Sequence, residues 1–408
     1  MSRRIALLAA FAAAIAGLAV GAATASPNRH TAPLARTSSQ LLVGINDEAN
    51  ALYGNPATAF AALKTLRAQV LRVNLYWGGN QWAVAPKKPA DATDPGDPAY
   101  NWAIYDRLVH YATDNNIKVV FSILFTPGWA NGGQAKNVAP TDYKDLENFA
   151  YAAAERYSGL WIPPSWQLDP SLGKPNTPLP KVTMWTAWNE PNNPLWLTPQ
   201  YKRVGTTWRV ESAYQYAKIC NAVYNGVHSP YLGPLQGEQV ACGVTGPKGN
   251  DAPKGIRPSV DALTFLTNAK KFGMKNFDVY AHHPYADKGS EAPNYKPAGA
   301  QVRRVQLGNI GTLITLLTKL YGPKHLWITE YGYQTNPPDK TVFGTSWANQ
   351  ALYMKQAFSM ARANPRIDMM LWFLIKDEPN IGGWQSGLQT VAGKKKPSWN
   401  TFLSIPRG

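Results

Sequence analysis

The feature that most constrains the fold of this 408-residue chain is a single pattern that recurs along it. Short runs rich in β-branched and aromatic residues alternate with longer segments whose apolar residues recur at helical spacing. Strict alternation of strand and helix is typical of a parallel sheet with crossover helices. The strand-like runs lie at residues 41–46, 70–77, 118–125, 182–189, 239–244, 277–282, 325–329 and 367–373.

The number of these units predicts how the sheet ends. Eight strands in a chain of this length favour a closed (β/α)8 TIM barrel of the α/β class, because closure leaves no strand edge exposed. An open doubly wound sheet is the alternative, but it usually has a glycine-rich phosphate-binding turn after its first strand. Residues 44–47 (Gly-Ile-Asn-Asp) lack that turn. We expect one barrel domain over residues 41–408. The helical segments lie at 59–68, 102–115, 143–157, 211–227, 260–272, 305–320 and 347–363.

Residues 1–25 have the pattern of an export signal. Arg3 and Arg4 precede an apolar, alanine-rich run, and residues 23–25 (Ala-Thr-Ala) suit a signal peptidase. The apolar run is short for a membrane span of ~20 residues. We therefore expect a secreted or cell-surface protein without stable membrane insertion, with residues 26–40 as an N-terminal extension. The arginine pair also resembles a twin-arginine signal, which would mean export after folding.

The chain contains two cysteines, Cys220 and Cys242. Both lie in the part expected to be exported, and an oxidising compartment favours a disulfide between cysteines in adjacent elements. A metal site would need further ligands at short spacing, and no such cluster is visible in the sequence. We expect a disulfide, no metal site and no cofactor.

The formal charge of +16 reflects 41 basic and 25 acidic residues. Such a charge favours attraction to anionic polymers at a cell surface. The basic residues are scattered except at 394–396, three lysines in a turn that contains glycine, proline and serine. That setting is typical of a solvated loop, and nucleic acid is not an expected partner.

Acidic residues are concentrated where the predicted strands end. Because the carboxyl ends of parallel barrel strands meet at one mouth, these side chains are candidates for a common site. Any one of them could instead cap the helix that follows. Glycosidic bond cleavage needs two carboxyl groups, which stand ~5–5.5 Å apart in the retaining mechanism. The strand-end acids are Asp47, Glu48, Glu190, Glu330, Asp377 and Glu378.

Two of these acids lie in recognisable motifs. Residues 188–192 (Trp-Asn-Glu-Pro-Asn) resemble the acid/base motif of clan A glycoside hydrolases, and residues 328–332 (Ile-Thr-Glu-Tyr-Gly) resemble the nucleophile motif of that clan. The arrangement is most similar to families 5 and 39, which are cellulase- and xylosidase-like. The resemblance implies hydrolysis of O-glycosidic bonds by double displacement, with Glu190 as general acid/base and Glu330 as nucleophile.

The same resemblance assigns further residues. Asn189 would bind the 2-hydroxyl of the sugar, and Arg72 would keep the nucleophile ionised. A structural ion pair is the alternative for Arg72. His283 and Tyr285 would line the subsite of the cleaved sugar, with the tyrosine bonded to the nucleophile. His282 is expected to be a core or supporting residue.

Tryptophans also follow several strands, and sugar rings stack on aromatic faces. We predict that Trp77, Trp129, Trp372 and Trp384 line a carbohydrate cleft, although packing in the core is the alternative for each. Trp372 resembles the strand-eight tryptophan that floors the subsite in related barrels.

Three other functions remain open at this point. A non-catalytic glycan-binding protein could use the same barrel, and a transglycosylase could use the same residues. A cell-wall structural protein could bind anionic polymer through charge alone. All three have a carbohydrate or anionic polymer as partner, and the sequence does not specify the sugar, its linkage, or endo or exo action.

Overall fold

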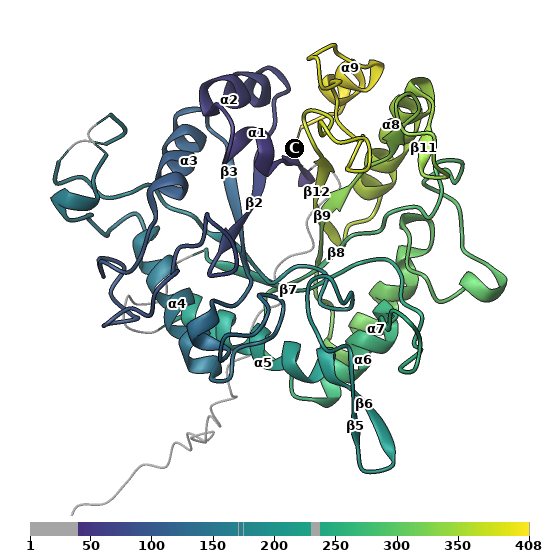
Figure 1. Ribbon diagram of the computed structural model, residues 1–408. Coiled ribbons are helices and arrows are strands. Elements are labelled where there is room, and N and C mark those ends of the chain that lie inside the picture. The colour runs from purple at the N-terminus through teal and green to yellow at the C-terminus, as the bar shows by residue number, and fades with distance from the viewer. Residues whose placement is uncertain (1–39, 170, 174, 230–236, 408) are drawn as a thin grey trace, which may run out of the picture. The chain divides into compact units, whose positions relative to one another are not determined.

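The computed structural model describes residues 40–407, except residues 170, 174 and 230–236. The expected signal peptide and nearly all of the N-terminal extension lie outside these residues. Eight parallel strands close into a barrel in the order β1-β12-β9-β8-β7-β4-β3-β2 (Figure 1). The predicted (β/α)8 barrel is therefore confirmed.

The barrel strands agree with the predicted runs to within a few residues at most ends. They are β1 (Leu42–Asn46), β2 (Val70–Tyr76), β3 (Lys118–Leu124), β4 (Met184–Ala187), β7 (Gln239–Thr245), β8 (Val279–His282), β9 (Leu326–Tyr331) and β12 (Ile367–Phe373). The helices are α1 (Glu48–Ala51), α2 (Pro56–Thr65), α3 (Ala103–Asp114), α4 (Tyr143–Arg156), α5 (Glu211–Val227), α6 (Ala262–Lys271), α7 (Ile310–Tyr321), α8 (Trp347–Ala363) and α9 (Pro397–Ser404).

Two small sheets lie in the loops that follow barrel strands. β5 (Tyr201–Val204) pairs antiparallel with β6 (Thr207–Val210), and β10 (Gln334–Thr335) pairs with β11 (Gly344–Thr345). The sequence analysis missed the β5–β6 hairpin, because each strand is only four residues long and most of its side chains are exposed.

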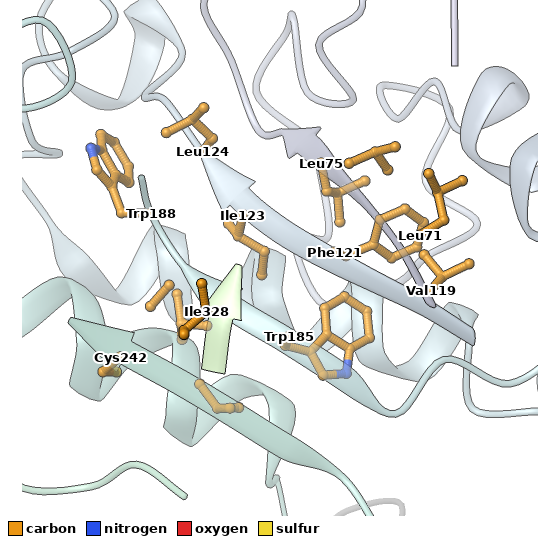
Figure 2. Close-up of a cluster of buried hydrophobic side chains, with 14 of the residues drawn as sticks. Leu71, Leu75, Val119, Phe121, Ile123, Leu124, Trp185, Trp188, Cys242 and Ile328 are labelled. Carbon is orange, nitrogen blue, oxygen red and sulfur yellow. The ribbon is translucent and has the colours of Figure 1, made fainter. Parts of the chain in front are cut away.

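The strands have a core on each of their two faces, because successive side chains point to opposite sides. Inside the barrel, Val70, Met369 and Leu371 belong to one buried cluster. The residues between them on the same strands, such as Leu71 and Met370, belong to the larger cluster between the sheet and the helices. Figure 2 shows part of this outer layer around β2, β3 and β4. The parity of a residue along its strand therefore decides which layer it enters.

The starts of several helices are set by side-chain caps. Asp142 accepts a hydrogen bond from the backbone nitrogen of Lys144 at the start of α4, at 2.8 Å. Ser346 caps α8 in the same way. Such caps satisfy amide groups that have no partner within the helix.

Cys220 on α5 and Cys242 on β7 form the predicted disulfide, with 5.8 Å between their Cα atoms. Both cysteines are buried, so the bridge ties a helix to a barrel strand inside the core. No helix among the described residues is long and apolar enough to cross a membrane.

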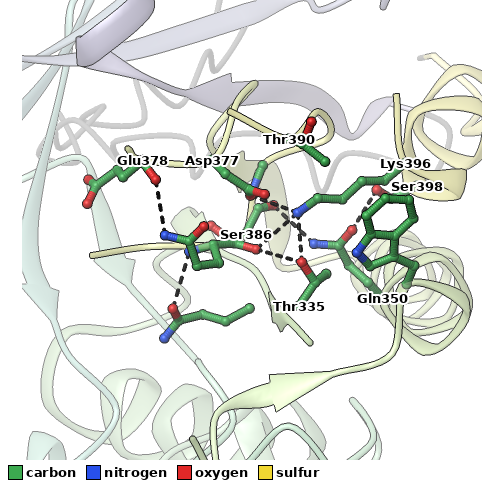
Figure 3. A network of polar contacts seen from close by, with 12 residues as sticks. Thr335, Gln350, Asp377, Glu378, Ser386, Thr390, Lys396 and Ser398 are labelled. Atoms are coloured by element: carbon green, nitrogen blue, oxygen red, sulfur yellow. Dashed lines mark hydrogen bonds and ion pairs between the residues drawn. The ribbon is translucent and has the colours of Figure 1, made fainter. Parts of the chain in front are cut away.

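The segment after β12 is held by a buried lysine. Lys396 Nζ donates to Asp377 Oδ1 at 2.7 Å and to Thr335 Oγ1 at 2.8 Å (Figure 3). The expectation of a solvated lysine triplet is therefore wrong for Lys396, which is only 1% exposed. A buried ammonium group needs a paired carboxylate, and Asp377 supplies it. Asp377 is thus a structural residue, whereas the neighbouring Glu378 carboxyl points away from the network in Figure 3.

Candidate active site

A cavity of about 590 Å³ lies at the carboxyl ends of the barrel strands. Its size is within the range of small-ligand sites. Residues from the ends of β1, β2, β4, β7, β8, β9 and β12 contribute to its wall. They include Glu48, Asn74, Asn189, Glu190, Gly246, Tyr285, Glu330, Phe373, Glu378 and Trp384.

The backbone at these strand ends is strained. Five non-glycine residues have positive φ angles there: Phe125 (62°), Trp188 (70°), Glu190 (34°), Val244 (46°) and Leu374 (81°). Each such residue costs on the order of 1–3 kcal/mol, and this kind of strain clusters at functional sites. Glu190 is held in place by a hydrogen bond from its backbone nitrogen to Val244 O at 2.8 Å.

Arg72 and Glu330 form a buried ion pair. Arg72 Nη1 lies 2.5 Å from Glu330 Oε1, while its other nitrogens donate to Asn189 Oδ1 and Ser122 Oγ, both at 2.7 Å. Burial raises the pKa of Glu330, but His283 and Arg72 together outweigh it and leave the pKa below its ordinary value. The contact with the Arg72 guanidinium therefore favours the ionised form of Glu330.

Glu190 and Glu330 face each other across His283. His283 Nδ1 lies 3.0 Å from Glu190 Oε1 and 3.7 Å from Glu330 Oε2. One oxygen of each carboxyl group and this nitrogen all lie within 4.8 Å of one another. Thr329 Oγ1 lies 2.9 Å from His283 Nε2. The Thr329 hydroxyl can donate to Nε2, which leaves Nδ1–H as the donor to Glu190.

The space beside Glu190 depends on a glycine. A Cβ atom on Gly246 would lie 3.1 Å from the carboxyl carbon of Glu190, closer than most side-chain contacts. Asn193 Nδ2 approaches the other carboxyl oxygen of Glu190 at 3.4 Å. The neighbours of Glu190 are therefore an imidazole and an amide, with no arginine bonded to it among the described residues.

Tyr285 is the second donor to Glu330. Its hydroxyl donates to Glu330 Oε2 at 3.2 Å, and burial together with the charge of Glu330 raises the pKa of Tyr285 far above the ordinary range. The phenol therefore stays protonated. Its ring lies 5.2 Å from that of Trp384 and 6.4 Å from that of Phe373, measured between centroids.

His282 has a structural role, as expected. It is fully buried, with Nδ1 2.8 Å from Thr245 Oγ1 and Nε2 2.9 Å from Val305 O. Burial lowers its pKa to about 3, so the ring is neutral near pH 7.

Glu190, His283 and Glu330 could also hold a metal ion by distance alone, because each offers a donor atom within the 4.8 Å triangle. A divalent cation there would also meet the Arg72 guanidinium, which already compensates the charge of Glu330. Cations repel at such distances in a site of low dielectric, and this charge arrangement disfavours a metal.

The structure separates the four predicted tryptophans. Trp384 lines the cavity and is 37% exposed. Trp77, Trp129 and Trp372 do not line it, and Trp77 and Trp372 are fully buried. Unlike Trp384, these three therefore lie outside this cavity, and strand parity gives the reason for two of them. Val70 and Leu371 point into the barrel, so Trp77 and Trp372, an odd number of residues away, belong to the outer core layer.

The sequence analysis also missed residues that line the cavity. Asn74 lies two residues after Arg72 and therefore points to the same face of the strand. The alternation of side chains along a strand could have predicted this position from the sequence. Phe373 lines the cavity where Trp372 was expected. Lys248, whose Nζ lies 3.1 Å from Asp287 Oδ1, comes from the loop after β7 and carries no recognisable pattern.

Comparisons with known proteins show that solved structures share the fold of this chain. No protein-family model matches the chain, and no curated protein matches it. Solved structures do: a family 39 glycoside hydrolase from the gut symbiont Bacteroides cellulosilyticus has a TM-score of 0.59 at 16% identity, with 90% of this chain and 64% of that chain covered. A glucosidase from Croceicoccus marinus has a TM-score of 0.59 at 14% identity, with 90% and 66% covered.

A third comparison extends the range of these similar structures. A fungal β-1,4-galactanase has a TM-score of 0.53 at 15% identity, with 89% of this chain and 99% of that chain covered. This chain spans about two thirds of the length of the first two proteins and nearly all of the third. At such identities the likeness is one of fold, and the barrel of this protein is similar to those of clan A glycoside hydrolases, as the motifs indicated.

Proposed function

We propose that this protein is a retaining glycoside hydrolase that cleaves O-glycosidic bonds by double displacement. The observation that carries the proposal is the pair of facing carboxyl groups, Glu190 and Glu330, whose oxygens approach within 4.8 Å. An inverting enzyme needs room for a water molecule between its carboxyl groups, which then stand ~6.5–9.5 Å apart. The short separation therefore supports retention.

In the first step, Glu330 attacks the anomeric carbon while Glu190 gives a proton to the departing glycosidic oxygen. Arg72 and Tyr285 each donate to one oxygen of Glu330 and so hold it ionised and oriented. Because Arg72 occupies the oxygen of Asn189, the Asn189 amide nitrogen is the group left to donate to the 2-hydroxyl of the sugar.

In the second step, Glu190 is a carboxylate and takes a proton from water, which attacks the glycosyl–Glu330 ester. His283 Nδ1 lies 3.0 Å from Glu190 Oε1 and can donate a hydrogen bond to the Glu190 carboxylate. Two inversions at one carbon give net retention. If another sugar replaces the water, the same residues perform transglycosylation.

We propose secretion or display at the cell surface as the location. The buried disulfide fits an oxidising compartment, and the substrate would be a polysaccharide or oligosaccharide. The net charge of +16 supports attraction of the enzyme to anionic polymers at such a surface.

A panel of 4-nitrophenyl glycosides and polysaccharides tests the proposal. We expect release of chromophore or reducing sugar, and proton NMR of the first product should show the anomeric configuration of the substrate. Release of the opposite anomer would exclude double displacement. Binding of a glycan without any release would favour a non-catalytic glycan-binding protein instead.

A further inference from the structure

A third carboxylate faces the cavity beyond the catalytic pair. Glu48, the first residue of α1, lines the cavity and accepts three hydrogen bonds. Asn74 N donates to its Oε1 at 2.6 Å, while the hydroxyls of Tyr76 and Tyr53 donate to its Oε2 at 2.8 and 3.0 Å. No cation among the described residues pairs with it directly, in contrast to Glu330.

These donors fix the carboxylate rigidly. Burial and the charge of Glu48 raise the pKa of Tyr76 and of Tyr53 far above the ordinary range, so both phenols remain donors. The Tyr53 ring stacks on Trp82 with 5.1 Å between centroids. Burial also raises the pKa of Glu48, against the opposing effect of its three donors and of Arg72. A fold that keeps a carboxyl group in such a place incurs a cost in desolvation, which a ligand could offset.

An orphaned acceptor lies beside it. The Asn74 side-chain oxygen is buried and has no hydrogen-bond partner among the described residues, although Asn74 Nδ2 donates to Tyr76 at 3.3 Å. Asn74 also lines the cavity. Buried polar atoms almost always have partners, so an unsatisfied oxygen at a cavity wall indicates a donor that arrives with the ligand.

Glu48 and Asn74 together form one wall of the cavity, and the course of β2 places this wall next to Glu330. Asn74 lies two residues after Arg72, on the same face of β2, and Arg72 is bonded to Glu330. Glu48 also lies close enough to Arg72 for the positive charge of Arg72 to lower the pKa of Glu48, against the larger effect of burial. The wall therefore adjoins the nucleophile, and the sugar that becomes bonded to Glu330 must meet it.

Building on the proposed function, we infer that Glu48 and Asn74 bind adjacent hydroxyl groups of the glycone, the sugar that Glu330 attacks, and thereby select a neutral sugar over a uronic acid. The wall presents acceptors, and hydroxyl groups supply the matching donors. A carboxylate on the glycone would bring a second negative charge against Glu48, and the buried site would screen it poorly.

Kinetics with paired substrates test the inference. We expect the wild-type protein to hydrolyse at least one neutral 4-nitrophenyl glycoside (of glucose, galactose, mannose or xylose) better than the glycosides of glucuronic and galacturonic acid. Glu48→Gln should lower kcat/KM for the best neutral glycoside by about 10- to 100-fold, the usual effect of losing a hydrogen bond to a charged group. Glu155→Gln, a change on α4 outside the cavity, should leave kcat/KM unchanged.

A deoxy substrate separates recognition from structural damage. When the hydroxyl that contacts Glu48 is absent, wild type and Glu48→Gln should have nearly equal kcat/KM values, because the variant then lacks nothing that the substrate offers. An equal deficit of the variant on every 3-deoxy, 4-deoxy and 6-deoxy glycoside would overturn the inference, as would a preference for uronic acids. If Glu48→Gln does not fold, as judged by thermal unfolding, Asn74→Ala serves for the same comparison.

The two proposals can fail separately. If the wild-type protein cleaves no glycoside, the proposed function fails, and quenching of tryptophan fluorescence by glucose, galactose, mannose, xylose and glucuronic acid still tests the wall. Saturable quenching by a neutral sugar that Glu48→Gln abolishes would support it. Equal responses of both proteins, or a response to glucuronic acid alone, would refute it.

Discussion

Replacing Arg72 by methionine tests whether a fixed cation keeps Glu330 ionised. Methionine fills much of the same volume without charge, so Glu330 would lose its bond from Arg72 but keep the one from Tyr285, with His283 Nδ1 still 3.7 Å from its Oε2. An opposite charge at this distance typically lowers a carboxyl pKa by about 1–3 units. The pKa of Glu330 should therefore rise by about 1–3 units in Arg72→Met.

The assay is the pH dependence of kcat at saturating substrate, which reports groups in the enzyme–substrate complex. Glu330 attacks only when ionised, so the acid limb of the profile should move to higher pH in Arg72→Met. Below the new pKa, kcat should fall about tenfold for each unit of the rise. At higher pH, where Glu330 is ionised in both proteins, the deficit should shrink.

Stability provides a second measurement with a definite sign. The pKa of Glu330 is lowered in the folded protein, so its ionisation stabilises the fold above the unfolded pKa, and this contribution is lost as pH falls through the folded pKa. Removal of one partner of a buried pair costs about 3–5 kcal/mol. The loss in Arg72→Met should be greatest near neutral pH and diminish in acid.

Arg156 provides a matched control. It is also fully buried and bonded to a carboxylate, Asp106, with Nη2 2.6 Å from Oδ2, but it lies outside the cavity. Arg156→Met should lower the free energy of unfolding by a similar amount and leave the acid limb unmoved. An acid limb of Arg72→Met that coincides with that of wild type would refute the role given to Arg72.

Other changes have distinct expected outcomes. Azide should rescue Glu190→Ala and give a glycosyl azide of retained configuration, whereas its rescue of Glu330→Gly should give the inverted azide. Polarimetry or NMR of the two adducts measures the configuration, and an exchange of the two configurations would show that the roles of the glutamates are reversed. Replacing Cys220 and Cys242 by alanine should lower the free energy of unfolding in denaturant by about 3 kcal/mol, as expected for a loop closed over 22 residues, and an unchanged midpoint would show that the bridge does not stabilise the fold. Trp384 lines the cavity, and its proposed role is to contact the sugar without taking part in proton transfer. Trp384→Ala should therefore raise KM more than it lowers kcat, and a loss confined to kcat would contradict this role.

The fold was predictable because the strands and helices of a barrel each produce a local pattern of apolar residues in the sequence. Each buried strand needs an apolar run, and each crossover helix needs an apolar face, so eight repeats were visible without any tertiary information. The strand-end position of Glu190 and Glu330 followed from the same repeats, since parallel strands bring their carboxyl ends to one mouth. The β5–β6 hairpin carried no such signal and was missed.

The walls of the cavity were less predictable, because they depend on which way a side chain points. Trp372 and Phe373 are neighbours, yet the structure places Trp372 in the outer core and Phe373 at the cavity. Asp47 and Glu48 are also neighbours: Asp47 caps α1 by accepting from Asn50 N at 2.9 Å, and Glu48 faces the cavity. A shift of one residue reverses the role, and composition near a strand end does not reveal it.

The different roles proposed for Glu190 and Glu330 can be traced to the kind of partner that each carboxyl group has. The Arg72 guanidinium donates to Glu330, and this contact favours the ionised carboxylate whenever Glu330 is not bonded to the sugar. Glu190 contacts an imidazole and an amide, and neither fixes a permanent positive charge against it. We infer that only Glu190 can exchange a proton at each step, whereas Glu330 is confined to nucleophilic attack and departure. Reversal of the roles would require an arginine on the other side of the cavity, and β2 supplies it to Glu330 alone among the described residues.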